Sequence, residues 1–229
     1  MKSIIWFRND LRIDDNPAMR VAYDNSTEVH AIFLYSKDQL EKHNEANVKL
    51  DFLIENLMCL SNVLKELNIH LSIIDSKGFD EDSQIILKTV QERNIDKVFF
   101  NKQFGEDEQK RDKEVINILE ASGIKAESFN DQIVYEAGSI RTGQNNPYSV
   151  FTPFKRKWVE NFDMEFLDIE HKYTPMSQEN FSSNISNFNF NFKIEHKVDM
   201  SLWPAGEQAA LDRLKNFLEN KVSNYSKDR

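Results

Sequence analysis

The stretch SIIWFRNDLRIDDNPA, residues 3–18, joins a short apolar run to a turn that carries several opposite charges. The run at 3–7 has the length and composition of a buried strand. Asn16 followed by Pro17 is typical of a helix start, because asparagine caps the first turn and proline fits the first helical position. The stretch therefore predicts a strand, a charged turn and a helix.

The same alternation of short apolar runs with helical periodicity continues to about residue 130. Further strands are expected at 29–35, 71–74, 98–100 and 124–129, and helices at 46–67, 85–90 and 106–120. Strands that alternate with helices form right-handed crossovers, which produce a parallel sheet covered on both faces. We therefore predict a doubly wound, Rossmann-like α/β domain with five parallel strands over residues 1–130. Ligands of such sheets bind beyond the carboxyl ends of the strands, so we expect a site in the loops after the first, second and fourth strands.

The pattern changes after this domain. Residues 131–200 are expected to form a connector with a helix near 153–162, and helical spacing returns at 206–221. The stretch NFSSNISNFNFNFKIEH, at 180–196, is rich in asparagine, serine and phenylalanine, which is typical of a linker that crosses a surface. Its alternation of phenylalanine with asparagine resembles a strand, so we expect some of these rings to pack on the first domain.

Composition excludes several classes of protein. The chain of 229 residues has a net charge of -9, which suits a phosphate backbone poorly. A single cysteine, Cys59, excludes an intrachain disulfide and is expected to be a buried thiol. No apolar run is long enough to span a membrane, and the start MKSIIWFRND becomes charged too soon for a signal peptide. We therefore expect a cytoplasmic protein that does not itself bind DNA or a membrane.

Motifs for a nucleophile or a metal are also missing. The five histidines are scattered without metal-ligand spacing, and no G-x-S-x-G elbow occurs. The stretch GSIRTGQN, at 138–145, has the spacing of a phosphate-binding loop but carries Gln144 where that loop needs lysine. We expect no catalytic residue and no metal site in this chain.

The charged turn has a structural explanation in part. Asp14, Asp15 and Asn16 favour the positive N-terminus of the following helix. Arg8 directly follows the apolar strand, so its guanidinium is expected to meet a carboxylate such as Asp10 in a partly buried pair. Such a pair predicts a rigid loop at the edge of the binding crevice.

Four stretches, in this order along the whole chain, resemble the signatures of the DNA photolyase and cryptochrome family. They are WFRNDLR at 6–12 followed by DN at 15–16, YSVFTPF at 148–154 with Trp158, WPAGE at 203–207 with Ala210, and Tyr225 with Arg229. The resemblance is greatest to bacterial cyclobutane pyrimidine dimer photolyases.

The resemblance implies an antenna domain, a connector and a large helical domain that binds FAD. In the family, light-excited reduced FAD gives an electron to a pyrimidine dimer that has been flipped out of the DNA. Residues 1–130 then correspond to the antenna domain, and 201–229 to the start of the FAD domain, whose remainder lies beyond this chain. Damaged DNA would be bound by that remainder, and we expect a monomer. The alternatives are a cryptochrome-type blue-light photoreceptor or a stand-alone module that binds a chromophore or nucleotide. The charged turn would hold the loop between the antenna and flavin domains.

The resemblance also implies site residues. In folate-binding members, a histidine after the second strand and an Asn-Glu pair after the fourth contact the folate. His43 stands at the first of these positions, and Asp107 and Glu108 stand at the pair. A carboxylate such as Glu108 can accept two N–H bonds from an amino-pyrimidinone ring. Asp107 replaces the expected amide, so methenyltetrahydrofolate, a flavin-type antenna or no antenna all stay open. The other interpretation is that these acids only begin the helix at 106–120.

Two further residues are assigned by the resemblance alone. Tyr225 corresponds to a residue that contacts the phosphates of FAD. Arg229 lies where the family approaches the DNA backbone.

Overall fold

The computed structural model describes residues 1–162, 171–178, 183–191 and 196–228. Its centre is a sheet of five parallel strands in the order β3-β2-β1-β4-β5. The strands are β1 (Lys2–Phe7), β2 (Glu28–Tyr35), β3 (His70–Asp75), β4 (Lys97–Asn101) and β5 (Lys125–Phe129). The expected strands and their parallel pairing are confirmed, and the sheet has the strand order of a Rossmann-like fold.

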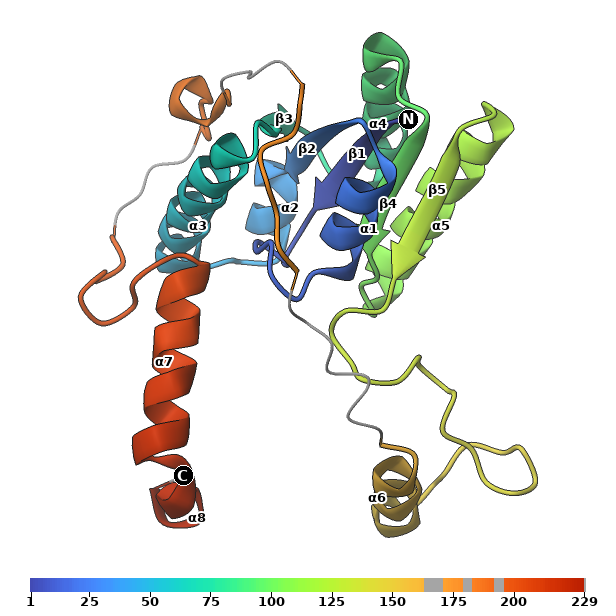
Figure 1. Ribbon diagram of the computed structural model, residues 1–229, viewed down its shortest axis with the longest axis vertical. Coiled ribbons are helices and arrows are strands. Elements are labelled where there is room, and N and C mark those ends of the chain that lie inside the picture. The colour runs from blue at the N-terminus through green and yellow to red at the C-terminus, as the bar shows by residue number, and fades with distance from the viewer. Residues whose placement is uncertain (163–170, 179–182, 192–195, 229) are drawn as a thin grey trace.

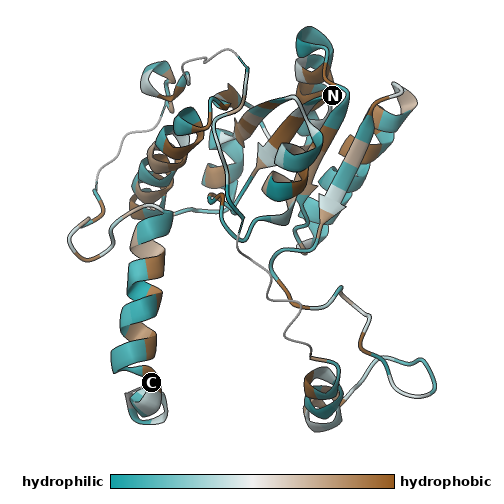
Figure 2. Cartoon of the chain, viewed as in Figure 1, coloured by the Kyte–Doolittle hydropathy of each residue, from teal (hydrophilic) through white to brown (hydrophobic). Residues whose placement is uncertain are grey.

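Helices cover both faces of the sheet (Figure 1). The long ones are α1 (Pro17–Asn25), α3 (Asn47–Glu66), α4 (Phe79–Arg93) and α5 (Glu106–Ala121). Alternate residues of β1 enter two separate cores: Ile5 and Phe7 pack with α1 and α3, whereas Ile4 and Trp6 pack with α4 and α5. Side chains of a strand point to opposite faces in turn, so a run that is apolar throughout is buried on both sides. Figure 2 shows the resulting concentration of hydrophobic residues in the strands.

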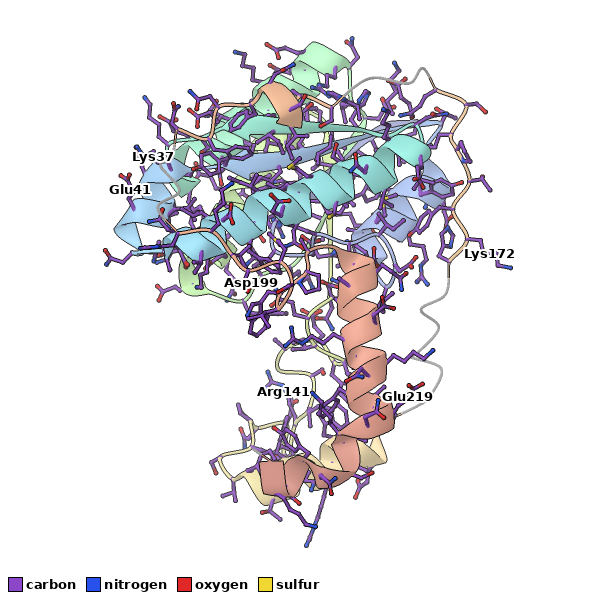
Figure 3. The ribbon with its side chains drawn as sticks, turned by 90° about the vertical axis from the view of Figure 1, so that its left-hand side faces the viewer. Lys37, Glu41, Arg141, Lys172, Asp199 and Glu219 are labelled. Atoms are coloured by element: carbon purple, nitrogen blue, oxygen red, sulfur yellow. The ribbon has the colours of Figure 1, made fainter. Side chains whose placement is uncertain are left out.

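Two short helices were not predicted from the sequence, α2 (Lys37–Lys42) and, at the end of the chain, α8 (Tyr225–Asp228). Helix α2 follows β2 and begins at Ser36, whose hydroxyl accepts the backbone N–H of Gln39 at 3.1 Å. Its six residues are too few for a hydrophobic period to appear. Its outer face carries Lys37 and Glu41, which form an ion pair at 3.4 Å (Figure 3).

The connector leaves the sheet after β5 and returns to it. Its first part projects away from the sheet and contains α6 (Phe151–Glu160), in agreement with the helix expected near 153–162 (Figure 1). Further along, Phe188 and Phe190 pack against the core on the α1 and α3 side, as expected for some rings of the linker. The described part of that linker forms a 3-10 turn, Ile185–Asn187, and no strand. Part of the predicted linker, at 180–182 and 192–195, lies outside the described residues.

The chain ends in α7 (Glu207–Asn220), a 3-10 turn at Val222–Asn224 and α8 (Tyr225–Asp228). Figure 3 shows α7 running away from the sheet, with Glu219 towards its far end. The domain boundaries at 130 and 200 stay predictions. Among the described residues, no helix has the length and apolar composition needed to cross a membrane.

Candidate functional site at the carboxyl edge of the sheet

The carboxyl ends of β1, β2 and β4 surround a pocket of about 300 Å³. Strand β1 lies between β2 and β4, so the connections leave it in opposite directions at this point. Such a switch point leaves a crevice between the loops, where doubly wound sheets bind their ligands. The pocket is lined by residues from the ends of these strands and the loops after them, together with Phe79 of α4. The loops selected from the sequence are therefore the ones that form the pocket.

The pocket combines an apolar wall with a few polar groups. Phe33, Leu40, Leu53 and Phe79 supply aromatic and aliphatic surface. Polar side chains come from the segments that follow β1, β2 and β4, and they include Arg8, Gln39, His43, Gln103, Glu108 and Arg111. This combination is typical of small-molecule sites, in which apolar contacts give affinity and a few polar groups fix orientation.

His43 stands directly after α2, where its backbone N–H bonds to the carbonyl of Gln39. Its imidazole is exposed, and its Nε2 lies 2.8 Å from the amide nitrogen of Gln39. An amide nitrogen donates, so Nε2 accepts and the proton of the neutral ring is assigned to Nδ1. With this assignment, the Nδ1 nitrogen of His43 is a hydrogen-bond donor.

Glu108 is the third residue of α5 and lines the same pocket. Its carboxylate folds back over Gly105, the residue before the helix, so closely that a Cβ at that position would overlap it. A glutamate at this position interacts favourably with the positive N-terminus of a helix. Glu108 therefore faces the pocket and also covers the start of α5.

Asp107 points elsewhere. Its side chain is 66% exposed, and its carboxylate lies 3.9 Å from the ammonium group of Lys110. The structure thus brings His43 and Glu108 together at one pocket and leaves Asp107 on the outer surface of α5. Asp107 fits the interpretation of an acid that begins the helix, and a contact between it and a chromophore stays a prediction.

Beside the pocket lies a buried ionic cluster that begins with Arg8. Its guanidinium lies over the ring of Trp6, 4.4 Å from the centroid, and donates to Asp112 at 3.2 Å. It also donates to the backbone carbonyl of Asn101. Burial lowers the pKa of Arg8, and the neighbouring Asp112 opposes that shift.

The expected pairing of Arg8 with a buried carboxylate is confirmed, but the partner is Asp112 and not Asp10. We expected a carboxylate such as Asp10, but the carboxylate of Asp10 accepts the backbone N–H of Arg8 and the side-chain amide of Asn101. The alternation along β1 places Arg8 on the same face as Trp6, towards α5, which supplies Asp112. Asp112 is 104 residues away in sequence, so only the fold brings the pair together.

Arg111 is a pocket residue that sequence reasoning missed. Its guanidinium lies between the rings of Trp6 and Phe79 and donates to Gln103 and Asp112 at 2.7 Å each. A signal was present, because residues 111, 115 and 119 recur at helical spacing and all three are buried. An arginine on the apolar face of a helix needs a buried partner, and here the next residue supplies it.

Tyr35, the last residue of β2, was also missed. It is 3% exposed, and burial raises its pKa to about 12, so the phenol stays protonated. Its hydroxyl donates to the carbonyl of Phe190 in the connector at 2.8 Å. In the sequence, Tyr35 is only the last residue of an expected strand. In the structure it forms a wall of the pocket.

The charged turn after β1 joins the body of the protein to α7. Arg12 donates to both oxygens of Asp131, and the carboxylate of Glu207 accepts the N–H groups of Ile13 and Asp14 at 3.0 Å each. Burial raises the pKa of Glu207, and the two backbone N–H groups oppose that shift. The turn thus contacts Asp131 through Arg12 and the start of α7 through two backbone N–H groups, and its role between an antenna domain and a flavin domain stays a prediction.

A larger hollow of about 990 Å³ lies between this turn, α3 and α7. Its apolar lining includes Leu11, Phe52 and Leu214.

The residues assigned near the end of the chain lie far from the pocket. Tyr225 begins α8 at the far end of α7, is 57% exposed and packs its ring against Phe217 (Figure 1). Its contact with FAD stays a prediction. Arg229 lies outside the described residues. The described part of the chain holds no cluster of three or more side chains suited to a metal ion.

Comparison with known proteins identifies the fold and the family. The family model described as DNA photolyase matches residues 3–176. The deoxyribodipyrimidine photo-lyase of Buchnera aphidicola (strain APS) is 30% identical over 98% of this chain and 46% of the relative. A bacterial class III photolyase from Agrobacterium tumefaciens superposes with a TM-score of 0.77 and 24% identity, over 99% of this chain and 46% of that one. An archaeal photolyase from Sulfolobus tokodaii superposes with a TM-score of 0.58 and 18% identity, over 83% of this chain and 40% of that one. The two solved structures, at 24% and 18% identity, establish only a shared fold. The chain spans about half the length of the curated relatives it matches.

Proposed function

The chain belongs to the DNA photolyase family, and from that premise we propose that its α/β part is an antenna domain whose pocket binds a light-harvesting chromophore. One observation carries the proposal: His43 and Glu108 face one pocket at the switch point of the sheet. Each was assigned to chromophore binding on sequence grounds, and they come from loops after different strands.

The pocket favours a planar ring with amide-like edges. Phe33 and Phe79 offer apolar surface, and Glu108 can accept two N–H bonds from a ring edge. His43 and Gln103 add a donor and an amide at other edges of the pocket. Pterins and flavins share this chemistry, so methenyltetrahydrofolate and a flavin are the two candidates. The surface position of Asp107 weakens the folate pattern. The archaeal photolyase is described with two FAD molecules and a novel light-harvesting cofactor.

For the whole protein we propose a deoxyribodipyrimidine photo-lyase. The names of the curated relatives support this activity, which is the light-driven splitting of pyrimidine dimers by reduced FAD. FAD and damaged DNA would be held mainly by the part of the protein that corresponds to the second half of the relatives. We place the protein in the cytoplasm as a monomer. The residues that separate a photolyase from a cryptochrome photoreceptor belong to that second half.

The antenna proposal is tested by titrating the purified chain with FMN, FAD and methenyltetrahydrofolate, following absorbance and fluorescence. We expect one of the three to bind at micromolar concentration. His43→Ala and Glu108→Gln should each weaken binding about tenfold, the effect of losing one good hydrogen bond in a ligand site.

Glu106→Gln is the matched control for Glu108→Gln. It removes the same charge from the same helical turn, but its side chain is 83% exposed and pairs with Lys110 outside the pocket. Its dissociation constant should stay within about twofold of that of the wild-type chain. Absence of binding by all three chromophores would contradict the proposal. Equal losses of affinity in Glu108→Gln and Glu106→Gln would also contradict it.

A further inference from the structure

The connector covers the outer edge of the sheet with side chains. Strand β3 lies at that edge, and within the described parts of the chain its outward N–H and C=O groups have no neighbouring strand. The amide of Asn184 accepts the N–H of Ile73 and donates to its carbonyl, both at 2.8 Å. Ser183 donates to the carbonyl of Leu71 at 2.8 Å. A side-chain amide carries one donor group and one acceptor. Asn184 therefore makes the two hydrogen bonds to Ile73 that a residue of a neighbouring strand would otherwise make.

The same segment reaches Tyr35 a few residues later. The carbonyl of Phe190 accepts the hydroxyl of Tyr35 at 2.8 Å. The rings of Phe188 and Phe190 meet the ring of Tyr35 edge-on, with centroids 5.9 and 5.1 Å away. These contacts hold the ring of Tyr35 in place.

Tyr35 links the pocket to the connector, because it lines the pocket and its hydroxyl donates to Phe190. It lines the pocket, whereas none of the described connector residues does so. Its hydroxyl is already bonded to Phe190, so its pocket face is the ring alone. A change in how the connector lies on the sheet would therefore reach a ligand through the position of this ring.

We propose that residues 183–190 of the connector control ligand binding in the pocket by positioning Tyr35. The inference rests on the proposed function, because it needs a ligand in that pocket. Coupling between two equilibria is reciprocal, so a ligand that contacts Tyr35 also stabilises the connector on the sheet. Ligand binding in the pocket would then change the stability of the connector segment that precedes α7 in the chain.

Hydrogen exchange and affinity test the coupling together. With whichever of FMN, FAD or methenyltetrahydrofolate binds, the amides of residues 185–188 should exchange more slowly in the complex. Tyr35→Phe keeps the ring but removes the bond to Phe190. It should weaken ligand binding about threefold to tenfold and abolish the ligand-dependent protection.

Tyr23→Phe is the matched control. The hydroxyl of Tyr23 also donates to a connector carbonyl, that of Thr174 at 2.9 Å, but Tyr23 does not line the pocket. This substitution should leave the ligand affinity within about twofold of wild type. Asn184→Ala supplies a second test should Tyr35→Phe fail to fold, because it removes both hydrogen bonds to Ile73 and leaves Tyr35 unchanged, yet should still weaken binding.

The outcomes separate this inference from the proposed function. Binding of a chromophore with unchanged exchange at 185–188, and with unchanged affinity in Tyr35→Phe and Asn184→Ala, would overturn the coupling alone. Absence of binding by all three chromophores would overturn the proposed function and the coupling with it.

Discussion

At the scale of single residues, Asn101 joins three segments beside the pocket. Its amide nitrogen donates to Asp10 at 2.7 Å and to Asn16 at 2.8 Å, and its amide oxygen accepts the N–H of Ala18 at 3.1 Å. Its backbone carbonyl accepts the guanidinium of Arg8. One buried side chain thus links the end of β4 to the charged turn and to the start of α1.

Asn101→Asp should lower the free energy of unfolding by about 2–4 kcal/mol at pH 7. The substitution replaces a donor with a carboxylate that faces Asp10 and the amide oxygen of Asn16, and both positions are buried. Urea denaturation followed by circular dichroism measures the loss. Gln91→Glu adds the same charge on the exposed face of α4 and should change stability by less than about 0.5 kcal/mol. A loss in Asn101→Asp no larger than that of the control would refute this role.

His30 gives the protein a dependence on pH. It is buried, its Nε2 lies 2.8 Å from Glu28, and burial lowers the pKa of its imidazole. The folded protein then holds the ring neutral, while the unfolded chain takes up a proton below about pH 6.5. The free energy of unfolding should therefore fall as the pH drops from about 6.5 towards the lowered pKa of the folded protein. The fall amounts to about 1.4 kcal/mol for each pH unit that separates the folded and unfolded pKa values.

Urea denaturation at about pH 7.5 and about pH 5.5 measures this fall in the free energy of unfolding. The fall should be smaller in His30→Gln than in wild type. His196→Gln, at an exposed position, should keep the wild-type fall. Equal falls in both variants would exclude His30 as the titrating group.

At the scale of elements, α7 is attached to the body by its first turn. Gly206 precedes it with a φ of +97°, a conformation that favours glycine, and donates its N–H to Asn56 of α3 at 3.0 Å. Glu207 then accepts the two N–H groups of the charged turn. This joint fixes the direction in which α7 leaves the sheet.

Glu207→Ala should release that joint. Loss of two charge-assisted hydrogen bonds should cost about 1–3 kcal/mol, and the amides of Ile13 and Asp14 should exchange faster with solvent. Hydrogen exchange resolved by residue gives the direct readout. Glu219→Ala removes an exposed carboxylate from the other end of the same helix and should leave both amides unchanged. Unaltered exchange at residues 13 and 14 in Glu207→Ala would show that the joint is held by other contacts.

The elements differ in how far the sequence alone could predict them. Strands and long helices follow from local patterns, so β1 to β5 and α3 were found close to their observed limits. Helix α2 was missed because six residues hold no full hydrophobic period, although Ser36 capped it. The pairing of Arg8 with Asp112 depends on strand order, which local patterns do not contain. His43 and Glu108 came from resemblance, and Tyr35 gave no signal, since its role depends on a connector contact 155 residues away.

At the scale of the whole molecule, α6 and α7 present apolar surface outside the α/β body. Leu214 and Leu218 of α7 and Phe151 of α6 are all more than half exposed. Figure 2 shows the hydrophobic residues of α7 along one side of the helix. Exposed apolar side chains that gather on one face of a helix are typical of a surface that packs against another part of a protein. It is consistent with a chain that spans about half of its relatives.

This chain alone should not repair DNA. With reduced FAD and light it should split no pyrimidine dimers, because the proposed flavin site lies mainly in the other half of the protein. Its net charge of -9 should also prevent binding to a dimer-containing duplex at physiological salt. Absorbance measures dimer splitting, and fluorescence anisotropy measures binding to the duplex. A full-length relative serves as the positive control in both assays. Light-dependent repair by residues 1–229 would contradict the division of function proposed for this family member.

The covering of β3 also has a consequence for synthesis. Asn184 follows Ile73 by 111 residues, so the sheet edge leaves the ribosome long before the side chain that covers it. At about 5–20 residues per second, the edge stays open for roughly 6–22 s on each nascent chain. During that interval its free N–H and C=O groups can pair with a strand of a neighbouring nascent chain. We therefore expect the yield of folded protein in the cell to fall when slow codons between these two positions delay the synthesis of the connector.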